Sequence, residues 1–427
     1  MQLVAYGAQD IYLTGNPQIT FFKVVYRRHT NFSIETIAQT FNSDVDFGKK
    51  SQVTIARNGD LIGAMHLEMK VQQLHQTTQT PTTTFCSWTN GLGNAMVKSI
   101  SIEIGGQEID KHYGEWLDIW GELNVKKDHR DAYDAMVGNT YTSDDADPAD
   151  SAVESPVTLY VPLRFWFNRN PGLALPLIAL QYHEVKLHLE LEESKYLVRT
   201  NTALTATPKN SDGSDVKVSS CNLLVDYIYL DTDERRRFAQ VSHEYLIEQL
   251  QHTGSESITA NTTNVNVDLN FNHPVKCLNW TIQDTTYSTV GSGPGGAVRR
   301  DDGNQKLRYS CLTARNNKYD TFESGKIQLN GHDRMSERDS DYFRLVQNVQ
   351  HMEVAPTKTI YTYSFGLKPA EHQPSGTCNF SRIDNAKLNL NFTATPHTAN
   401  ATELKVYATN YNVLRIMSGM GGLAYSN

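Results

Sequence analysis

Cysteine is scarce in this 427-residue chain, and the few cysteines are scattered along it. No two of them form a CxxC pair, which excludes a zinc knuckle and a dithiol redox motif. A disulfide framework is not expected from so few distant residues, so we predict reduced thiols in a chain assembled in a reducing compartment. The five are Cys86, Cys221, Cys277, Cys311 and Cys378.

Long apolar runs and an excess of positive charge are also missing. The best apolar stretch, residues 173–180, is interrupted by Pro176 and is far shorter than the ~18 residues of a membrane-spanning helix. The first residues lack the basic start and apolar core of a signal peptide. Lys and Arg total 39 against 47 Asp and Glu, which gives a formal net charge of −8. Direct binding to nucleic acid needs clustered positive charge and is therefore not expected.

Motifs that mark catalytic sites are absent as well. The chain has no phosphate-binding GxxxxGK[ST] loop, no HExxH zinc helix and no GxSxG nucleophile elbow. Its 14 histidines include no HxH pair, the close spacing that is typical of metal-binding double-stranded β-helices. We therefore predict no catalytic residue, no cofactor and no metal site.

Two charged segments need a separate interpretation. The acidic loop at residues 144–150 offers carboxylates to a hard cation, but it lacks the glycine and the closing Glu of an EF-hand. We interpret it as a solvated surface loop. The basic run at residues 235–237 follows acidic residues at 231, 233 and 234, so ion pairing at a domain junction is favoured over a nucleic-acid patch.

Short segments that alternate apolar and polar residues recur along the chain. Each is bounded by Gly, Asn, Asp or Pro, which is typical of half-buried antiparallel strands. Residues 111–126 are instead predicted to be helical, because Trp116, Trp120 and Leu123 share one apolar face. Many strands, one clear helix and no βαβ rhythm indicate sandwiches or barrels. The clearest expected strands are at residues 21–26, 99–104, 185–191, 223–230, 326–329, 387–392 and 403–407.

This strand pattern occurs twice. Gly105-Gly106 and Asn330-Gly331 each separate two strand-like segments and predict tight hairpins with positive φ. Downstream, VKLHLEL at residues 185–191 is echoed by AKLNLNF at residues 386–392, and each follows a Pro-Gly or Pro-Ser-Gly loop. The pairs keep their order at offsets near two hundred residues. The chain is therefore predicted to contain two similar β-domains joined near residues 232–245.

Six N-x-[ST] sequons are candidate glycosylation sites, although several such matches arise by chance in a chain rich in Asn and Thr. Without a signal peptide, glycosylation by the host secretory pathway is not expected. Asn279 and Asn391 fall within expected strands. Asn261 and Asn400 fall in plausible loops, and we retain these two as candidates.

Several longer segments are similar to one known family. The chain closely resembles the major capsid proteins of nucleocytoplasmic large DNA viruses, and most closely those of the algal-virus branch. The resemblance covers essentially the whole chain. It is carried by residues 3–23 (LVAYGAQDIYLTGNPQITFFK), 25–32 (VYRRHTNF), 171–186 (PGLALPLIALQYHEVK), 374–385 (PSGTCNFSRIDN) and 410–425 (NYNVLRIMSGMGGLAY).

The resemblance implies an all-β fold of two consecutive eight-stranded antiparallel jelly rolls, with a short helix and long surface loops. It implies an N-terminal arm over residues 1–25, a first jelly roll over residues 26–235 and a second over residues 236–427. The implied function is structural and non-enzymatic. Three copies would form a homotrimeric capsomer of pseudo-hexagonal outline, and capsomers would tile the icosahedral shell of a large double-stranded DNA virus.

The same resemblance implies partners and a location. The expected partners are further copies of the chain, minor capsid proteins, a nearby internal viral membrane and surface glycans. The chain is expected in the outer capsid of a virion that is assembled in the host cytoplasm. Residues 1–17 are expected at the inner face, and the Gly- and Met-rich tail at residues 417–425 is expected to be packed rather than free.

Two other classes of function stay open on the residues alone. A carbohydrate-binding jelly-roll module would fit the many Tyr and Trp residues and the polar loops. A metal-dependent jelly-roll enzyme would fit the fold, but the missing HxH pair disfavours it. Neither class accounts for the similarity along the whole chain.

Overall fold

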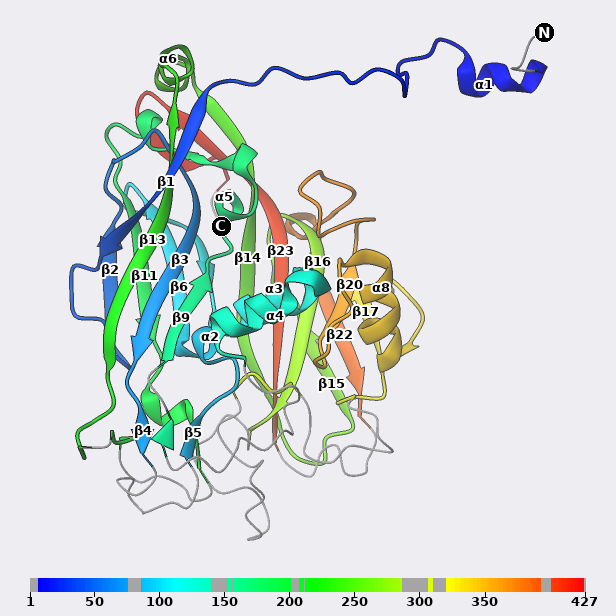
Figure 1. The fold of residues 1–427 in the computed structure, drawn as a ribbon. Helices are drawn as coiled ribbons and strands as arrows, with labels where there is room; N and C mark the ends of the chain where they lie inside the picture. The colour runs from blue at the N-terminus through cyan, green and yellow to red at the C-terminus, as the bar shows by residue number, and fades with distance from the viewer. Residues whose placement is uncertain are drawn as a thin grey trace.

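Two β-sandwiches lie side by side in the computed structural model of the chain, and a narrow arm leads away from the first (Figure 1). The structure describes residues 7–75, 86–139, 153–154, 157–200, 207–210, 212–285, 306–309, 320–392 and 401–425. Each sandwich has two main antiparallel sheets, built from one half of the sequence.

In the first sandwich, one sheet has the order β1-β13-β3-β10, with β9 also paired to β3, and the other has the order β2-β11-β6-β7. Two small pairs, β4 with β8 and β5 with β12, lie at one end. The strands are β1 (Phe32–Thr40), β2 (Lys50–Thr54), β3 (Leu61–Val71), β4 (Leu74–His75), β5 (Cys86–Trp88), β6 (Val97–Ile104), β7 (Gln107–His112), β8 (Val153–Glu154), β9 (Val157–Pro162), β10 (Leu175–Pro176), β11 (Val185–Leu191), β12 (Val198–Thr200) and β13 (Val218–Leu230).

The second sandwich repeats this arrangement. One sheet has the order β14-β23-β16-β20, with β21 and β24 at its margins, and the other has the order β15-β22-β17-β18, with β19 beside β17. The strands are β14 (His243–Ile258), β15 (Asn264–Asp268), β16 (Pro274–Asp284), β17 (Ser324–Leu329), β18 (His332–Asp333), β19 (Arg338–Asp339), β20 (Tyr361–Ser364), β21 (Cys378–Asn379), β22 (Ala386–Asn391), β23 (Thr402–Met417) and β24 (Met420–Leu423).

The two sandwiches share one topology, which confirms the expected double jelly roll. Strands β1, β13 and β3 correspond in order and pairing to β14, β23 and β16, and β2, β11, β6 and β7 correspond to β15, β22, β17 and β18. Strands β9 and β10 both pair with β3, as β20 and β21 both pair with β16. When each of these pairs is taken as one interrupted strand, each jelly roll has eight principal strands within the described residues.

The two predicted hairpins are equivalent turns in this duplicated fold. Gly105 and Gly106 join β6 to β7 with φ of 58° and 88°, and Asn330 and Gly331 join β17 to β18 with φ of 52° and 79°. Two successive positive φ values match the twist of the flanking strands, which is why Gly and Asn stand at these positions. The other expected strands also form, except for residues 21–26.

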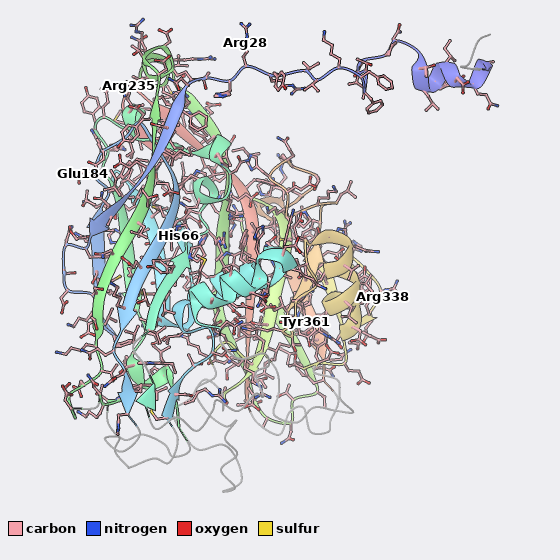
Figure 2. All side chains as sticks on the ribbon, viewed as in Figure 1. Arg28, His66, Glu184, Arg235, Arg338 and Tyr361 are labelled. Carbon is pink, nitrogen blue, oxygen red and sulfur yellow. The ribbon has the colours of Figure 1, made fainter. Side chains whose placement is uncertain are left out.

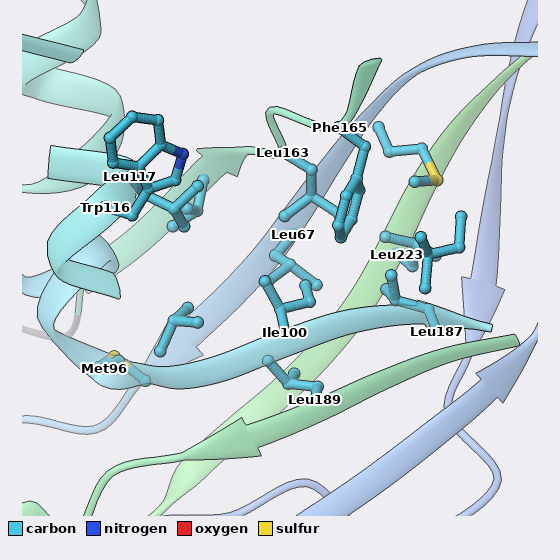
Figure 3. Close-up of a cluster of buried hydrophobic side chains, with 14 of the residues drawn as sticks. Leu67, Met96, Ile100, Trp116, Leu117, Leu163, Phe165, Leu187, Leu189 and Leu223 are labelled. Atoms are coloured by element: carbon cyan, nitrogen blue, oxygen red, sulfur yellow. The ribbon is translucent and has the colours of Figure 1, made fainter. Parts of the chain in front are cut away.

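Apolar side chains that alternate along the strands fill each jelly roll. In the first, Leu67, Leu187 and Leu223 come from three different strands and are fully buried (Figure 3). In the second, Trp280 and Leu390 have the same role. Because successive side chains of a strand point to opposite faces, the period-two pattern of the sequence places these residues inside.

The predicted helix at residues 111–126 is confirmed with shorter bounds. Helix α3 (Gly114–Asn124) carries Trp116 and Leu123 on its buried side, and the chain turns at Val125 before a second helix, α4 (Lys127–Val137). Helix α4 was not expected from the sequence, because it buries only Tyr133 and Val137. The other short α-helices are α1 (Ile11–Thr14), α2 (Leu92–Met96), α5 (Trp166–Arg169), α6 (Thr232–Gln240) and α8 (Gln347–His351), and η6 (Tyr342–Val346) is a π-helix. Single 3-10 turns are η1 (Ala8–Asp10), η3 (Pro171–Leu173), η4 (Leu177–Ala179), η5 (Ser194–Tyr196) and η7 (Phe380–Arg382).

The strand predicted at residues 21–26 is wrong. Residues 15–31 have no regular secondary structure, and the described chain provides no strand that pairs with them. Their alternating apolar pattern is present, but a strand also needs a neighbour for its backbone hydrogen bonds. Residues 7–31 therefore form an extended segment ahead of β1 that stands clear of both jelly rolls (Figure 1). This segment includes the described part of the arm expected over residues 1–25.

Candidate functional site

Buried polar side chains are paired across the contact between the two jelly rolls, and we call this contact the seam. It consists of α3 on the first roll and the facing side chains of β14, β16, β23 and residues 354–358 on the second. Glu115, Asp118 and Glu122 lie on one face of α3 because they are spaced by three and four residues. All three carboxylates are buried, so each needs a partner. Glu122 pairs with Arg130 of α4 in the same roll.

The second jelly roll supplies those partners. Lys405 Nζ lies 2.6 Å from Glu115 Oε1, and Lys358 Nζ lies 2.8 Å from Asp118 Oδ2. Glu122 Oε2 accepts hydrogen bonds from the backbone N–H and the hydroxyl of Thr357. Burial by itself raises the pKa of Glu115, but the Lys405 ammonium outweighs this effect and leaves the pKa below its ordinary value. The seam therefore holds a charged pair that is largely shielded from bulk water.

Aromatic rings fill the seam beside these ion pairs. The ring of Trp116 lies 5.7 Å from that of Tyr407, and His252 stacks on Tyr407 at 4.5 Å. Tyr113 meets His252 edge-on at 5.2 Å. The Tyr407 hydroxyl donates a hydrogen bond to Glu115. Burial lowers the pKa of His252, so the neutral imidazole is the form that this stack favours.

A second ionic cluster lies where α5 meets β14 and β16. Glu248 Oε2 is 2.7 Å from Arg169 Nη1 of the first roll and 2.6 Å from Lys276 Nζ of the second. Burial by itself raises the pKa of Glu248. The two cations lower this pKa by more than burial raises it, so the net shift is downward. A hollow of about 410 Å³, lined by residues such as Trp166 and His372, opens beside this cluster. Glu248 therefore links the two rolls through one carboxylate.

The C-terminal hairpin of β23 and β24 also reaches across to the first roll. The backbone N–H of Tyr182 donates to the Gly419 carbonyl at 3.0 Å, and His183 Nδ1 lies 3.0 Å from the Gly421 carbonyl. Residues 417–425 were expected to be packed, and the backbone is indeed paired as a strand. The side chains of Met417, Met420 and Tyr425 remain 47%, 51% and 63% exposed, so the expectation fails for them.

The arm carries the largest set of exposed apolar side chains described in the chain. Phe22 is 98% exposed and Tyr26 is 88% exposed, far above what a folded core allows. Figure 2 shows Arg28 in the extended segment that leads away from both rolls. Apolar side chains gathered on one surface mark an interaction site. The others are Ile11, Tyr12, Leu13, Ile19, Phe21, Val24 and Val25.

The candidate glycosylation sites differ in what the structure says of them. Asn261 is exposed in the turn between β14 and β15, with φ of 63°. Asn400 lies outside the described residues. Asn279 and Asn391 lie in β16 and β22, as expected, and Asn279 is buried.

The charged segments and cysteines can be placed in part. Arg235 in α6 pairs with Asp60 of the first roll at 3.0 Å, which confirms ion pairing at the domain junction for that arginine (Figure 2). The acidic loop at residues 144–150 and Cys311 lie outside the described residues. Cys221, Cys277 and Cys378 are free thiols, and burial raises the pKa of Cys221 to about 12.

Metal and membrane sites are not found in what the structure describes. Across residues 7–425, leaving aside the gaps given above, no three His, Cys, Asp or Glu side chains gather as a metal site would require. Among the described helices, none has the length and apolar character needed to cross a bilayer.

Reasoning from the sequence did not identify the seam. The signal was present in α3, where Glu115, Asp118 and Glu122 alternate with tryptophans on an otherwise apolar helix. Carboxylates interleaved with buried aromatic residues predict a face that meets cations from another element. Their partners, Lys358 and Lys405, are more than two hundred residues away in the sequence, and no local pattern singles them out.

Known proteins are similar to this chain along its whole length. The family described as "Major capsid protein N-terminus" matches residues 20–231, and "Large eukaryotic DNA virus major capsid protein" matches residues 234–422. The major capsid protein of Pyramimonas orientalis virus is 50% identical, with 100% of this chain and 99% of the relative aligned. That of Paramecium bursaria Chlorella virus 1 is 44% identical with the same coverage.

Solved structures agree with the fold described above. The chain superimposes on PBCV-1 VP54, from a crystal structure fitted into a reconstruction of the virophage Sputnik, with a TM-score of 0.78 and 40% identity over 96% of this chain and 100% of the other. The Faustovirus major capsid protein gives a TM-score of 0.76 at 12% identity, over 96% of this chain and 94% of the other. The second likeness concerns the fold alone.

Proposed function

Because this chain belongs to the family of large eukaryotic DNA virus major capsid proteins and forms the outer shell of the virion, we propose that it acts as a homotrimeric building block. Three copies associate into a capsomer with a pseudo-hexagonal outline, and capsomers tile an icosahedral shell. The role is structural and involves no catalysis and no direct contact with nucleic acid. Assembly takes place in the host cytoplasm.

The observation that carries this proposal is the duplication held together by the seam. Two jelly rolls of one topology lie beside each other, and buried pairs such as Lys405–Glu115 fix their relative position. Three such subunits present six similar rolls around one axis, which is the condition for a trimer to pack as a hexagon. A seam free to hinge would not give a subunit of defined outline.

We assign separate roles to the segments. The arm over residues 1–25 contacts minor capsid proteins or the membrane side of the shell, and its exposed apolar side chains support this role. The first jelly roll spans residues 26–235 and the second spans residues 236–427. Surface glycans are carried on the exterior, with Asn261 and Asn400 as candidate sites.

The trimer is tested by light scattering coupled to size-exclusion chromatography. One chain has a mass of 48.0 kDa, so three chains give 144 kDa. We expect the 144 kDa species to persist on dilution and in moderate salt, because obligate interfaces are broad and apolar. A stable 48.0 kDa species at all concentrations would refute the homotrimer.

The role of the arm is tested by deleting residues 1–17. The deletion leaves both jelly rolls intact, since none of the described side chains of the arm is buried against them. We expect soluble trimers of the shortened chain that do not form shells when co-expressed with the other virion proteins. Shells of normal size from the shortened chain would disprove this role of the arm.

A further inference from the structure

The two equivalent sheets of the jelly rolls differ in how their outer faces are covered. In the second roll, every residue of β16 from Val275 to Asp284 is buried, so both faces of that sheet are covered. In the first roll, the matching strand β3 is buried over residues 61–63 and then alternates between buried and more exposed residues as far as Val71. Alternation of this kind marks a sheet with only one covered face.

The cover on the second roll comes from the first. Helix α3 lies in the connection between β7 and β9 and packs on the outer face of β14, β23 and β16, where Trp116 meets Tyr407 and Glu115 pairs with Lys405. Trp120 and Leu123 line the same contact together with Asn279 of β16. A helix from one roll thus completes the sheet of the next.

The matching face of the first roll is open and partly apolar. In its edge strand β1, Ile34, Thr36 and Ala38 lie on the same outer face. Ile34 is 58% exposed, and Ala38 is also exposed. Leu224 of β13 lies opposite Ala38, and it points outward because its neighbours Leu223 and Val225 are buried. In the single chain these apolar side chains face solvent or are only half buried.

The second roll carries a helical segment in the place where the first carries α3. The pair η6–α8 lies in the connection between β18 and β20, which corresponds to the connection between β7 and β9. It packs on its own roll through Phe343, Gln347 and Asn348, which are buried. On its outer side Leu345, Val346 and Val349 are 43%, 40% and 69% exposed.

These two unpartnered faces cannot meet within one chain. In Figure 2, His66, on the β3 sheet, and Arg338, which lies beside Tyr342 of η6, are on opposite sides of the molecule. We propose that η6–α8 of one copy packs on the outer face of β1, β13 and β3 of a second copy, in the way that α3 packs on β14, β23 and β16 within the chain. The inference rests on the proposed function, since it names the surfaces that join copies in the trimer.

Such a contact is heterologous, because the helical face of each copy meets the sheet face of the next. Head-to-tail contacts close into a ring when the rotation per copy divides a full turn. In a ring of three copies, each with two jelly rolls, contacts within a chain then alternate with contacts between chains. Both contacts use a helix from one roll and the outer sheet of the following roll.

The test uses one variant for each face. Val346→Asp with Val349→Asp places two carboxylates on the helical face, and Ile34→Asp with Ala38→Asp places two on the sheet face. All four positions are exposed, so each variant should keep the circular-dichroism spectrum of the wild type and unfold cooperatively on heating. We expect the wild type at 144 kDa and each variant at 48.0 kDa by light scattering.

Mixing the two variants gives the decisive result. Each retains one intact face, so a single intact junction joins one copy of each, and we expect a 96 kDa heterodimer that grows no further. The matched control is Val241→Asp, which changes an exposed valine just after α6, at the far end of the molecule from α8, and should remain at 144 kDa.

The outcomes separate this inference from the homotrimer itself. If the wild type is trimeric and either double variant is also trimeric, the named faces are wrong while the trimer stands. The same holds if the mixture stays at 48.0 kDa or if the valine control dissociates. If the wild type is itself a monomer, the homotrimer fails, and the proposed contact fails with it.

Discussion

Replacing Lys405 by methionine removes the cation from a buried ion pair of the seam. Glu115 then stays between the jelly rolls without its ion-pair partner and keeps the Tyr407 hydroxyl as a hydrogen-bond donor, 3.1 Å away. Removing one member of a buried pair typically costs about 3–5 kcal/mol, because the remaining charge is desolvated and uncompensated. We expect a loss of that size in the free energy of unfolding of the Lys405→Met variant at pH 7.

The pH dependence identifies the cause of that loss. In the wild type the pKa of Glu115 lies below its ordinary value of 4.5, so the pair stays intact down to pH 5 and its stabilisation is lost only as the pH falls through the lowered pKa. In the variant, burial without the cation raises this pKa, and the folded protein takes up a proton on mild acidification. The difference between variant and wild type should therefore shrink from pH 7 to pH 5.

Guanidinium unfolding followed by tryptophan fluorescence is a suitable assay, since Trp116 lies in the seam against Tyr407. Protein concentration is kept constant because association contributes to apparent stability. The matched control is Lys387→Met, whose partner Asp268 is 3.5 Å away with both side chains exposed, and which should cost less than about 1 kcal/mol. Equal losses in the two variants, or no change with pH, would refute the reasoning.

Three further changes have expected outcomes. His252 has a pKa lowered by burial, so below pH 6.5 the unfolded chain binds a proton that the folded chain does not. The free energy of unfolding should therefore fall by up to about 1.4 kcal/mol for each unit by which the pH decreases. His252→Gln should remove this contribution when the free energy of unfolding is measured against pH. Gly114→Ala would place a methyl group 2.1 Å from the Asn94 carbonyl oxygen, so we expect little soluble folded protein on expression. Gly106→Ala has open space around its Cβ and should lower the free energy of unfolding, measured by denaturation, by only about 1–2 kcal/mol. Trp280→Ala in the second core should cost about 3–5 kcal/mol in the same assay.

Much of the fold follows from local patterns. The alternation in residues 185–191 specifies β11 residue for residue, and the Gly-Gly and Asn-Gly turns specify both hairpins, because these features depend on neighbours in the sequence. The duplication could be inferred because the two jelly rolls keep these features in the same order.

Other features depend on partners that a local pattern does not reveal. Residues 21–26 alternate as a strand does, yet they extend away from both rolls, because strand formation needs a neighbouring backbone as well as a pattern. Lys405 occupies an ordinary polar position in the alternating pattern of a strand. Its role in the seam depends on Glu115, in a helix almost three hundred residues earlier in the sequence. Helix α4 is mostly polar, and the face it buries is too small to stand out.

The single peptide link through α6 changes the thermodynamics of the proposed capsomer. Within each chain the second jelly roll is tethered to the first at a high effective concentration, so the seam forms without an association step. A ring of six separate rolls would need five association events, whereas three tethered pairs need two. Each event avoided saves an estimated 4–15 kcal/mol of translational and rotational free energy at the standard state. The duplicated chain can therefore assemble at far lower concentration than six free rolls with the same contacts.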